Sequence, residues 1–449
     1  MIGLHKELEE LEQQGCPVLV GMIGCGQMGV DVVSTTHMMR GLRIVAVADI
    51  DIERAKAAYE TSLIEGEFVQ VNTAGEADRA VSEGKRVYTT DYRVITDMKS
   101  ISVMLEATGV PEVGAKAAIR SARNGQQLAM MNVETDITVG PLLNWYARQK
   151  GVLYAMAAGD EPAACKELYD FAVSCGFTIV AAGKGKNNPL DRYAKPTDES
   201  WAREAERRGL NPNMLIEFVD GSKTMIEMAC ISNATGLIPD VRGMHGPVTH
   251  REILNKTFAL KKDGGVLNKT GVVDFGIGGV HPGVFLIVTT EHPRLRQALV
   301  YRDMGNGPYY TLFRPYHLCS IEVPLTCAML AIRGRSNMEP LECLVSEVFA
   351  VAKQDLNTGD KLDNIGGSMF YSLIDTYETS SQERLLPIGL AKNAVVKRHL
   401  MKDTPITLDD VELDEASTVL DLRRLQTFWM SGDISENELI NKIDSLVAD

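Results

Sequence analysis

A glycine-rich turn near the N-terminus carries the clearest chemical signal of the sequence. An apolar run over 18–23 leads into Gly24-x-Gly26-x-x-Gly29, and a second apolar run over 42–48 ends in Asp49. In this pattern the first glycine permits a tight turn, the second lets the backbone approach a pyrophosphate, and the third lets a helix pack on the strand. The N-terminus of that helix offers unpaired N–H groups to the phosphates. The spacing predicts a dinucleotide-binding unit of the kind found in nicotinamide-dependent oxidoreductases.

Two side chains near this turn give opposite indications about the dinucleotide. Asp49 would accept a hydrogen bond from a ribose 2′-hydroxyl and repel a 2′-phosphate, which favours NAD(H). Arg54 lies one turn into the next predicted helix and would hold that phosphate, which favours NADP(H). The other residues expected around the cofactor lie in the turn and after later strands: Gln27, Met28, Thr108, Gly109 and Asn132.

A basic run in the middle of the chain is a second candidate site. Lys184, Lys186, Arg192 and Lys195 stand against a single acid, Asp191, in a protein of net charge −14. Because the two lysines at 184 and 186 follow a predicted strand, we expect them at a carboxyl edge, where α/β proteins bind ligands. The run predicts a site for an anionic substrate, with the arginine or the last lysine binding a phosphate. A solvated loop is the alternative.

A lysine and a glutamate on one predicted element form a third candidate. Lys223 and Glu227 share a face whether the segment over 224–232 is a strand or a helix. Since burying unpaired charge is costly, we interpret the lysine as an ammonium that polarises a substrate oxygen. Its glutamate is then its partner or a metal ligand, and a purely structural ion pair is the alternative. Asn233, at the end of this segment, is a further expected substrate contact.

Two carboxylates and a histidine complete the chemically suggestive residues. Asp160 and Glu161 are expected ligands of Mg²⁺ or Mn²⁺, or else caps of a helix that begins at Pro162. His317 suits proton transfer near neutral pH, although a histidine at a helix start also serves as a hydrogen-bonded core residue. The histidines show no HxH or HExxH spacing, which argues against zinc. The candidate catalytic residues are therefore Asp160, Lys184, Lys186, Lys223, Glu227 and His317.

The composition is that of a globular protein with two or three domains. The 449 residues exceed what one hydrophobic core supports, and 45% apolar with 24% charged residues is ordinary. No apolar run reaches the roughly 18–20 residues of a membrane span. The net charge of −14 argues against nucleic-acid and anionic-membrane partners. Eight scattered cysteines without a CxxC pair predict reduced thiols and a cytoplasmic location.

Alternating strand and helix signals must position these residues. After a helix over 1–14, they predict an α/β fold in which residues 1–157 form a Rossmann domain around a parallel sheet. Its strands are expected over 18–23, 42–48, 86–90, 102–105, 127–132 and 152–157. Residues 60–84 are expected to be a surface insertion.

Two further domains are expected after the parallel sheet. Residues 158–345 should form an α+β domain for substrate binding and dimerisation, with a loop over 196–213. Strands are expected there over 178–182, 215–220, 224–232 and 271–290. Residues 346–449 should form a small β domain that ends in a helix over 437–447.

Several of these motifs resemble a known group of enzymes. The glycine turn from Ile23, the loop Glu106-Ala-Thr-Gly-Val-Pro111 and the strand end at Asn132 resemble the homoserine dehydrogenase type of Rossmann domain. Gly159-Asp160-Glu161-Pro162 stands where that family has a glycine-rich substrate loop, and the stretch from Val351 resembles a SAF domain. The combination resembles the DXR-like oxidoreductases.

The resemblance implies a specific reaction. It implies NADPH-dependent conversion of 1-deoxy-D-xylulose 5-phosphate to 2-C-methyl-D-erythritol 4-phosphate, a step of isoprenoid precursor synthesis. Lys184, Lys186, Lys195 and Lys223 would then bind the phosphate and the developing oxyanion, with a divalent metal. The acidic pair at 160–161 and the basic run depart from homoserine dehydrogenase, so we do not expect an amino-acid semialdehyde as substrate.

Two other interpretations stay open. The chain would be a plain NAD(P)-dependent dehydrogenase of a sugar, a polyol or a homoserine-like substrate if no phosphate is recognised. It would be a cofactor-binding sensor if it binds the dinucleotide without transferring hydride. In each case we expect a homodimer, because the C-terminal module is small.

Overall fold

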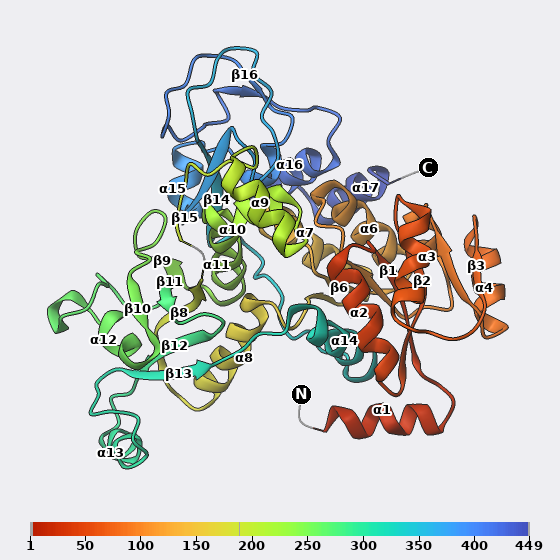
Figure 1. Cartoon of the computed structure of the whole chain (residues 1–449), viewed down its shortest axis with the longest axis horizontal. Helices are drawn as coiled ribbons and strands as arrows, with labels where there is room; N and C mark the ends of the chain where they lie inside the picture. Colours follow the sequence, from red (N-terminus) through yellow and green to blue (C-terminus); the bar gives the residue numbers. More distant parts are fainter. Residues whose placement is uncertain (1–2, 188, 448–449) are drawn as a thin grey trace. The chain divides into compact units, whose positions relative to one another are not determined.

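The computed structural model describes residues 3–187 and 189–447. They form two compact units, each assembled from separate stretches of the chain, as the sequence colouring of Figure 1 shows. The first unit comprises Met1–Ala163, Leu318–Glu342 and Ser417–Asp449, and the second comprises Ala164–His317 and Cys343–Ala416. This division differs from the expected domains 1–157, 158–345 and 346–449, because the chain returns to the first unit twice.

The first unit is built on a parallel sheet of seven strands in the order β3-β4-β2-β1-β5-β6-β7. The strands are β1 Val18–Ile23, β2 Leu42–Ala48, β3 Phe68–Gln70, β4 Arg86–Thr89, β5 Val103–Glu106, β6 Gln127–Met130 and β7 Tyr154–Met156. Its helices are α1 Leu4–Gln13, α2 Gln27–Met38, α3 Ile52–Thr61, α4 Ala74–Ser82, α5 Tyr92–Asp97, α6 Pro111–Arg123, α7 Val133–Gln149, α14 Cys319–Ala328 with the π-helical turn Met329–Arg333, α16 Thr418–Ser431 and α17 Glu436–Ser445.

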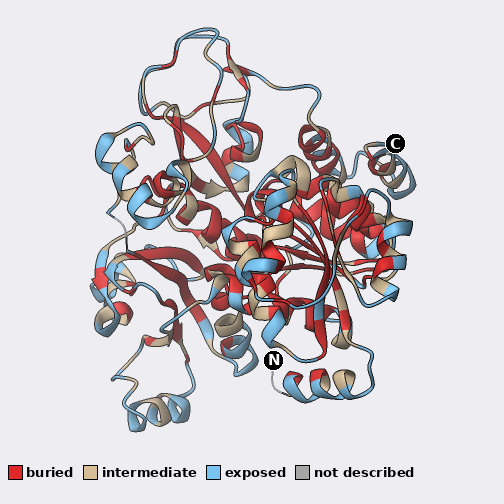
Figure 2. Ribbon diagram, turned by 45° about the vertical axis from the view of Figure 1, so that its right-hand side comes forward, coloured by how far each residue is buried: buried red, intermediate tan, exposed pale blue. Residues whose placement is uncertain are grey.

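Burial on both faces explains the apolar strands of this sheet. Val20, Met22 and Val47 are at most 1% exposed, and Figure 2 shows the strands buried between helices whose outer sides are exposed. Strands covered on both faces read as continuous apolar runs rather than alternating ones. The expected α/β class with a parallel Rossmann sheet is confirmed.

The expected surface insertion over 60–84 is wrong. This segment supplies the edge strand β3, which pairs with β4, and the helix α4. Thr73 and Glu76 form a capping box at the start of α4. The Thr-x-x-Glu spacing was visible in the sequence and is the signal that could have predicted this helix.

The C-terminal helices belong to the first unit rather than to a β domain. Figure 1 shows α16 and α17, in dark blue, beside α6 and α7. The Glu112 carboxylate on α6 accepts a hydrogen bond from the Thr418 backbone N–H at 3.0 Å, and Arg423 donates to the Thr138 carbonyl at 2.9 Å. Glu112 thus caps a helix that begins more than three hundred residues later, a pairing that no local pattern reveals.

The second unit contains a mixed sheet of six strands in the order β10-β11-β8-β12-β13, with β9 beside β11. The strands are β8 Thr178–Lys186, β9 Ile238–Pro239, β10 Val248–His250, β11 Val272–Gly279, β12 Val284–Thr289 and β13 Tyr310–Arg314. Two small antiparallel sheets pair β14 Ser346–Ala352 with β15 Phe370–Thr376 and β16 Val395–Val396 with β17 Val411–Glu412. The helices are α8 Glu161–Ser174, which begins in the first unit, α9 Glu199–Arg208, α10 Pro212–Val219, α11 Ser222–Thr235, α12 Leu254–Thr257, α13 Pro293–Tyr301 and α15 Tyr377–Gln382, with 3-10 turns at Arg251–Ile253, Lys261–Asp263 and Ile388–Leu390.

Three expectations for this region are wrong. The expected loop over 196–213 contains α9 and the start of α10, and the expected strands over 215–220 and 224–232 are α10 and α11. Helix α10 has its own start signal, since Asn211 caps it and Pro212 occupies its first position. Helix α11 is buried on nearly all sides, so it lacks the polar face that gives an amphipathic helix its period.

The helices and the cysteines also bear on what membrane spans and disulfides would require. No helix in residues 3–187 and 189–447 is long and apolar enough to cross a membrane. All eight cysteines are free thiols.

A buried ion pair joins the β14–β15 hairpin to the loops around it. The Lys353 ammonium donates to Asp220 Oδ2 at 2.9 Å, to the Ala194 carbonyl at 2.9 Å and to the Gly367 carbonyl at 2.7 Å. Both charged side chains are fully buried. Three donors with three acceptors satisfy this ammonium completely, so one side chain holds three separate segments together.

Replacing this lysine should destabilise the second unit. Lys353→Met leaves the Asp220 carboxylate buried without its counter-ion, which costs about 3–5 kcal/mol in comparable sites. We expect a clear fall in the thermal unfolding midpoint, and partial recovery when Asp220→Asn is added in the same chain. Lys397→Met, at an exposed lysine of the same region, is the matched control. An equal loss in both single variants would contradict this assignment.

Candidate functional site

The glycine turn after β1 is closed by contacts of its own backbone. A Cβ atom on Gly24 would lie 2.7 Å from the Ala107 carbonyl, and one on Gly29 would overlap the Gly24 carbonyl oxygen. Gly24 also has a φ of 100°, which only glycine adopts readily. The fold itself therefore requires these two glycines.

Gly26 differs from its neighbours, because nothing lies within 4 Å of a Cβ placed on it. Gly26 and Gln27 are exposed, Met28 is half-buried, and α2 begins at Gln27. The first N–H groups of a helix have no partner within the helix. No packing requirement among the described residues explains a glycine here, whereas the close approach of a phosphate does.

Asp49 at the end of β2 fastens this turn. Its carboxylate accepts the Cys25 N–H at 2.8 Å and the Asp51 N–H at 3.0 Å, and the Arg54 guanidinium lies 3.9 Å away. The Asp49 side chain is 7% exposed, whereas that of Arg54 is 53% exposed. The predicted acid is thus first a structural support of the turn, and its contact with a ribose stays a prediction.

The strand ends beside the turn carry a buried carboxyl group that sequence reasoning missed. Glu106 ends β5, is fully buried, and accepts hydrogen bonds from the Thr108 N–H and hydroxyl. Burial raises the pKa of this carboxyl to about 7, and the hydrogen bonds from Thr108 partly oppose this increase. Gly109 follows with a φ of 67°, and Asn132 caps α7 by accepting the Thr135 N–H at 3.0 Å. A glutamate that ends an apolar strand was the signal for Glu106.

A small pocket opens at the carboxyl ends of β6 and β7. Met130, Met156 and Val323 contribute apolar walls, and Asp160 contributes a carboxylate. Ligands of doubly wound α/β folds bind outside the carboxyl ends of the strands. The pocket therefore lies at the edge of the sheet where a ligand is expected.

In the second unit, two lysines of β8 face the helices α10 and α11. Lys184 and Lys186 are two positions apart, so their side chains leave the same face of the strand. The Lys184 ammonium pairs with the Glu227 carboxylate, and the Lys186 ammonium donates to the Phe218 carbonyl. Lys184, Lys186 and Glu227 are all buried residues, each at most 4% exposed.

This arrangement revises the predicted pairing of Glu227. The Glu227 carboxylate pairs with Lys184 on the strand β8, whereas the sequence suggested Lys223, one turn away on the same helix, as its partner. Burial, together with the positive charge of Lys184, lowers the pKa of Lys186 to about 8. An amine with this pKa exchanges protons near neutral pH, as general acid–base catalysis requires.

The later cations of the basic run contact other segments than the lysines of β8 do, and the predicted phosphate contact of Arg192 or Lys195 stays a prediction. Lys195 donates to the Gln354 side chain at 2.6 Å, and the Arg192 guanidinium lies 5.7 Å from the centre of the Tyr371 ring. Both therefore contact the segment that carries β14 and β15, whereas the lysines of β8 contact α10 and α11. The run leaves the strand after Lys186, so strand alternation no longer holds the later cations to one face.

Asn233 has a structural role, and its predicted substrate contact stays a prediction. Its side-chain oxygen accepts the Val345 N–H at 2.8 Å and the Ser346 N–H at 3.0 Å. Since Asn233 is 1% exposed, it fastens the start of β14 to α11. The physical reason is that α11 is a helix, which turns this residue into the protein.

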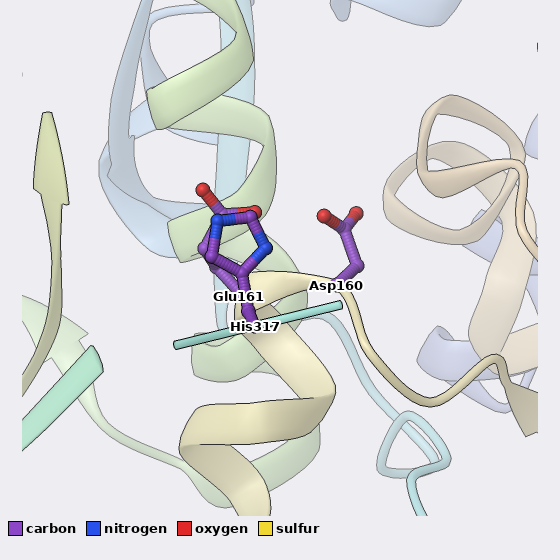
Figure 3. Close-up of side chains that lie close together, drawn as sticks. All are labelled: Asp160, Glu161 and His317. Atoms are coloured by element: carbon purple, nitrogen blue, oxygen red, sulfur yellow. The ribbon is translucent and has the colours of Figure 1, made fainter. Parts of the chain in front are cut away.

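Asp160, Glu161 and His317 lie close together, as Figure 3 shows. One ligand atom from each lies within 4.8 Å of the others, and α8 begins at Glu161. The His317 ring also packs edge-on against His281, with centroids 6.4 Å apart. Carboxylate oxygens with one imidazole are a donor set that suits Mg²⁺ poorly at the nitrogen and Mn²⁺ better.

Comparison with protein families finds one match. Residues 159–323 match the family model described as "Oxidoreductase DRL, catalytic domain". The matched segment contains Asp160, Lys184, Lys186, Lys223, Glu227 and His317, the six candidate catalytic residues. No curated protein matches the sequence.

Comparison with solved structures finds dehydrogenases of low similarity. A probable dehydrogenase from Thermotoga maritima is 12% identical, with a TM-score of 0.41, and the match covers 72% of this chain and 90% of that one. Scyllo-inositol dehydrogenase from Lactobacillus casei, with bound NAD(H) and scyllo-inositol, is 10% identical, with a TM-score of 0.38. This match covers 71% of this chain and 90% of that one. Myo-inositol 2-dehydrogenase from Lactobacillus plantarum is 13% identical, with a TM-score of 0.39, and the match covers 71% of this chain and 91% of that one. Such distant likeness transfers no substrate or cofactor to this chain.

The comparisons therefore back the coarser part of the predicted function. The segment that follows the parallel sheet is similar to the catalytic domain of an oxidoreductase. They do not support a reductoisomerase, an isoprenoid pathway, a homoserine dehydrogenase identity or a SAF domain, because the matching description names none of these. A dinucleotide-type sheet followed by an oxidoreductase-like segment is what this chain contains.

Proposed function

We propose that this protein is an NAD(P)-dependent oxidoreductase that transfers hydride between its cofactor and a sugar or polyol. The observation that carries the proposal is the glycine turn, in which Gly26 alone faces open space at the start of α2. The family match to an oxidoreductase catalytic domain supports it independently. This was the alternative interpretation of the sequence, and it replaces the reductoisomerase as the main one.

The proposed cofactor is NADP(H), with NAD(H) as the alternative. Gly26, Gln27 and Met28 would bind the pyrophosphate, and Thr108 and Gly109 would lie along the nicotinamide ribose. The Asp49 carboxylate already accepts two backbone N–H groups, whereas the Arg54 guanidinium is half exposed and available to a 2′-phosphate. Arg54→Gln should then weaken binding of NADPH and leave that of NADH unchanged.

The lysines of β8 are proposed to serve the proton side of the reaction. The bound nicotinamide supplies or accepts the hydride. The Lys184 ammonium, paired with Glu227, polarises the substrate oxygen, and Lys186 delivers or removes the proton at that oxygen. Lys223, on α11, is proposed to orient the substrate.

Asp160 and Glu161 are proposed ligands of a divalent cation. Their position at the start of α8, with their oxygens near one another, supports this. The alternative, that they only cap the helix, predicts no response to metal. Mn²⁺ should raise the thermal midpoint of the native protein and not that of Asp160→Asn.

A cofactor and substrate screen tests the proposed function. Oxidation of NADPH and NADH is followed by absorbance with ketoses and inosose-type ketones as substrates. The reverse reaction, reduction of the oxidised cofactor, is followed with polyols. A separate arm measures NADPH oxidation with 1-deoxy-D-xylulose 5-phosphate plus Mn²⁺. Turnover with an unphosphorylated ketone is the expected result. Turnover with the phosphorylated deoxy-ketose alone would restore the reductoisomerase, and binding of neither dinucleotide would overturn the proposal.

Two glycine variants separate binding from folding. Gly26→Ala places a methyl group where the pyrophosphate approaches, so we expect NADPH affinity to fall at least about tenfold, with a stability change below about 1 kcal/mol. Gly29→Ala forces a clash with the Gly24 carbonyl and should destabilise the unit by about 1–3 kcal/mol. Fluorescence titration with NADPH and thermal unfolding measure the two effects. Unchanged affinity in Gly26→Ala would contradict the assignment of this turn.

The lowered pKa of Lys186 should give a pH-dependent stability. An unfolded lysine titrates near 10.4, so above about pH 8 the unfolded chain binds more protons than the native one, and native stability rises with pH. The Lys186→Met variant lacks this rise. Its free energy of unfolding, relative to that of the native protein, should therefore fall between about pH 8 and 10 by roughly 1.4 kcal/mol per unit of difference between the folded and unfolded pKa of Lys186. Urea unfolding between about pH 7 and 10 measures this, with the exposed Lys262→Met as control. Parallel curves for all three proteins would show that Lys186 is not perturbed.

A further inference from the structure

A cavity of about 280 Å³ opens in the first unit, away from the glycine turn. It is lined by Leu42 and Arg43, the first residues of β2, and by Thr36 and His37 at the end of α2. The glycine turn lies at the opposite ends of both elements. None of the residues assigned to the cofactor lines this cavity.

Basic side chains dominate the polar lining of this cavity. Arg40, Arg43 and Arg86 reach it, and Glu12 is its one carboxylate. That carboxylate is already used, because it accepts the Gly41 N–H at 2.8 Å and the Arg43 guanidinium at 2.7 Å. Arg40 lies 3.6 Å from Glu9 at an exposed position.

Arg86 is the charge without a counter-ion. Its Nε atom is buried without a hydrogen-bond partner, and its Nη1 atom donates only to the Glu65 carbonyl, at 3.4 Å. No carboxylate in the described part of the chain forms an ion pair with it. Burial, reinforced by the charge of Arg43, lowers the pKa of this guanidinium. Holding such a charge is costly unless a ligand satisfies it.

Apolar residues also line the cavity. Val33, Leu42 and Ile64 form walls beside the arginines. The volume lies just below the range of about 300–1,000 Å³ that small-molecule sites occupy. A guanidinium pairs with a carboxylate or phosphate through two parallel hydrogen bonds.

We propose that this cavity binds a small organic anion, whose carboxylate or phosphate group is held by Arg86 and Arg43 and whose apolar body lies on Val33, Leu42 and Ile64. The site is separate from the cofactor turn, so the proposal holds whichever dinucleotide or substrate the enzyme uses. Helix α2 runs from the turn to this cavity and would carry any effect of one ligand on the other.

Titration of the full-length protein with phenyl phosphate and benzoate, and with phenol as the neutral analogue, tests the proposal. Thermal unfolding and calorimetry are measured on the native protein and on Arg86→Gln. We expect the two anions to raise the thermal midpoint of the native protein and phenol not to. In Arg86→Gln the apparent Kd for the anions should rise at least about tenfold. The free protein should unfold at a higher temperature, because a half-buried charge whose Nε atom lacks a hydrogen-bond partner is gone.

Arg79→Gln is the matched control, since Arg79 is an exposed arginine of α4 in the same unit. It removes the same charge and should leave the anion affinity within about twofold of the native value. Arg86→Lys, which keeps the charge without the fork, should fall between native and Arg86→Gln, and it replaces the latter if that variant fails to fold. Equal affinity in Arg79→Gln and Arg86→Gln, or no anion binding by the native protein, would overturn the proposal.

Discussion

Buried positive charge is the constraint around which much of this molecule is organised. A lysine or arginine taken out of water requires a partner, and the chain brings those partners from distant segments. Lys353 has Asp220 and two carbonyl groups, and Lys184 has Glu227 from the facing helix. These pairs decide which helices and strands must lie together in the second unit.

The same constraint separates structural cations from those available for chemistry. The Lys353 ammonium has three acceptors at 2.7–2.9 Å and no capacity for a ligand. Lys186 donates to a carbonyl instead of a carboxylate, and its burial lowers its pKa to about 8. Arg86 has no carboxylate among the described residues. Whether a buried cation has a carboxylate partner, more than its charge alone, therefore indicates which cations could bind a ligand.

The first unit shows a similar division among uncharged residues. Gly24 and Gly29 are glycines because the backbone packs on them, whereas Gly26 is free of protein contacts. The Asp49 carboxylate and the Glu106 carboxyl group fasten the loops that follow β2 and β5. These hydrogen bonds fasten the loops around the surface to which we propose that the dinucleotide binds.

The sequence by itself determined the parts whose signals are local. The glycine turn, the strands of the parallel sheet other than β3 and the lysines on β8 follow from short patterns whose period matches the element. Helix α10 had a local start signal too, in Asn211 and Pro212, which the apolar residues that follow obscured. Helix α11 was ambiguous because burial on all sides removes the polar face on which its period depends.

Only the tertiary structure decided how distant segments combine. It gave Glu227 to Lys184, directed Arg192 and Lys195 towards Tyr371 and Gln354, and used Asn233 to hold β14. It also returned α16 to the first unit, where Glu112 caps it. The physical reason is that such pairings depend on which buried charges and backbone groups meet after the chain has folded, and spacing along the sequence does not contain that information.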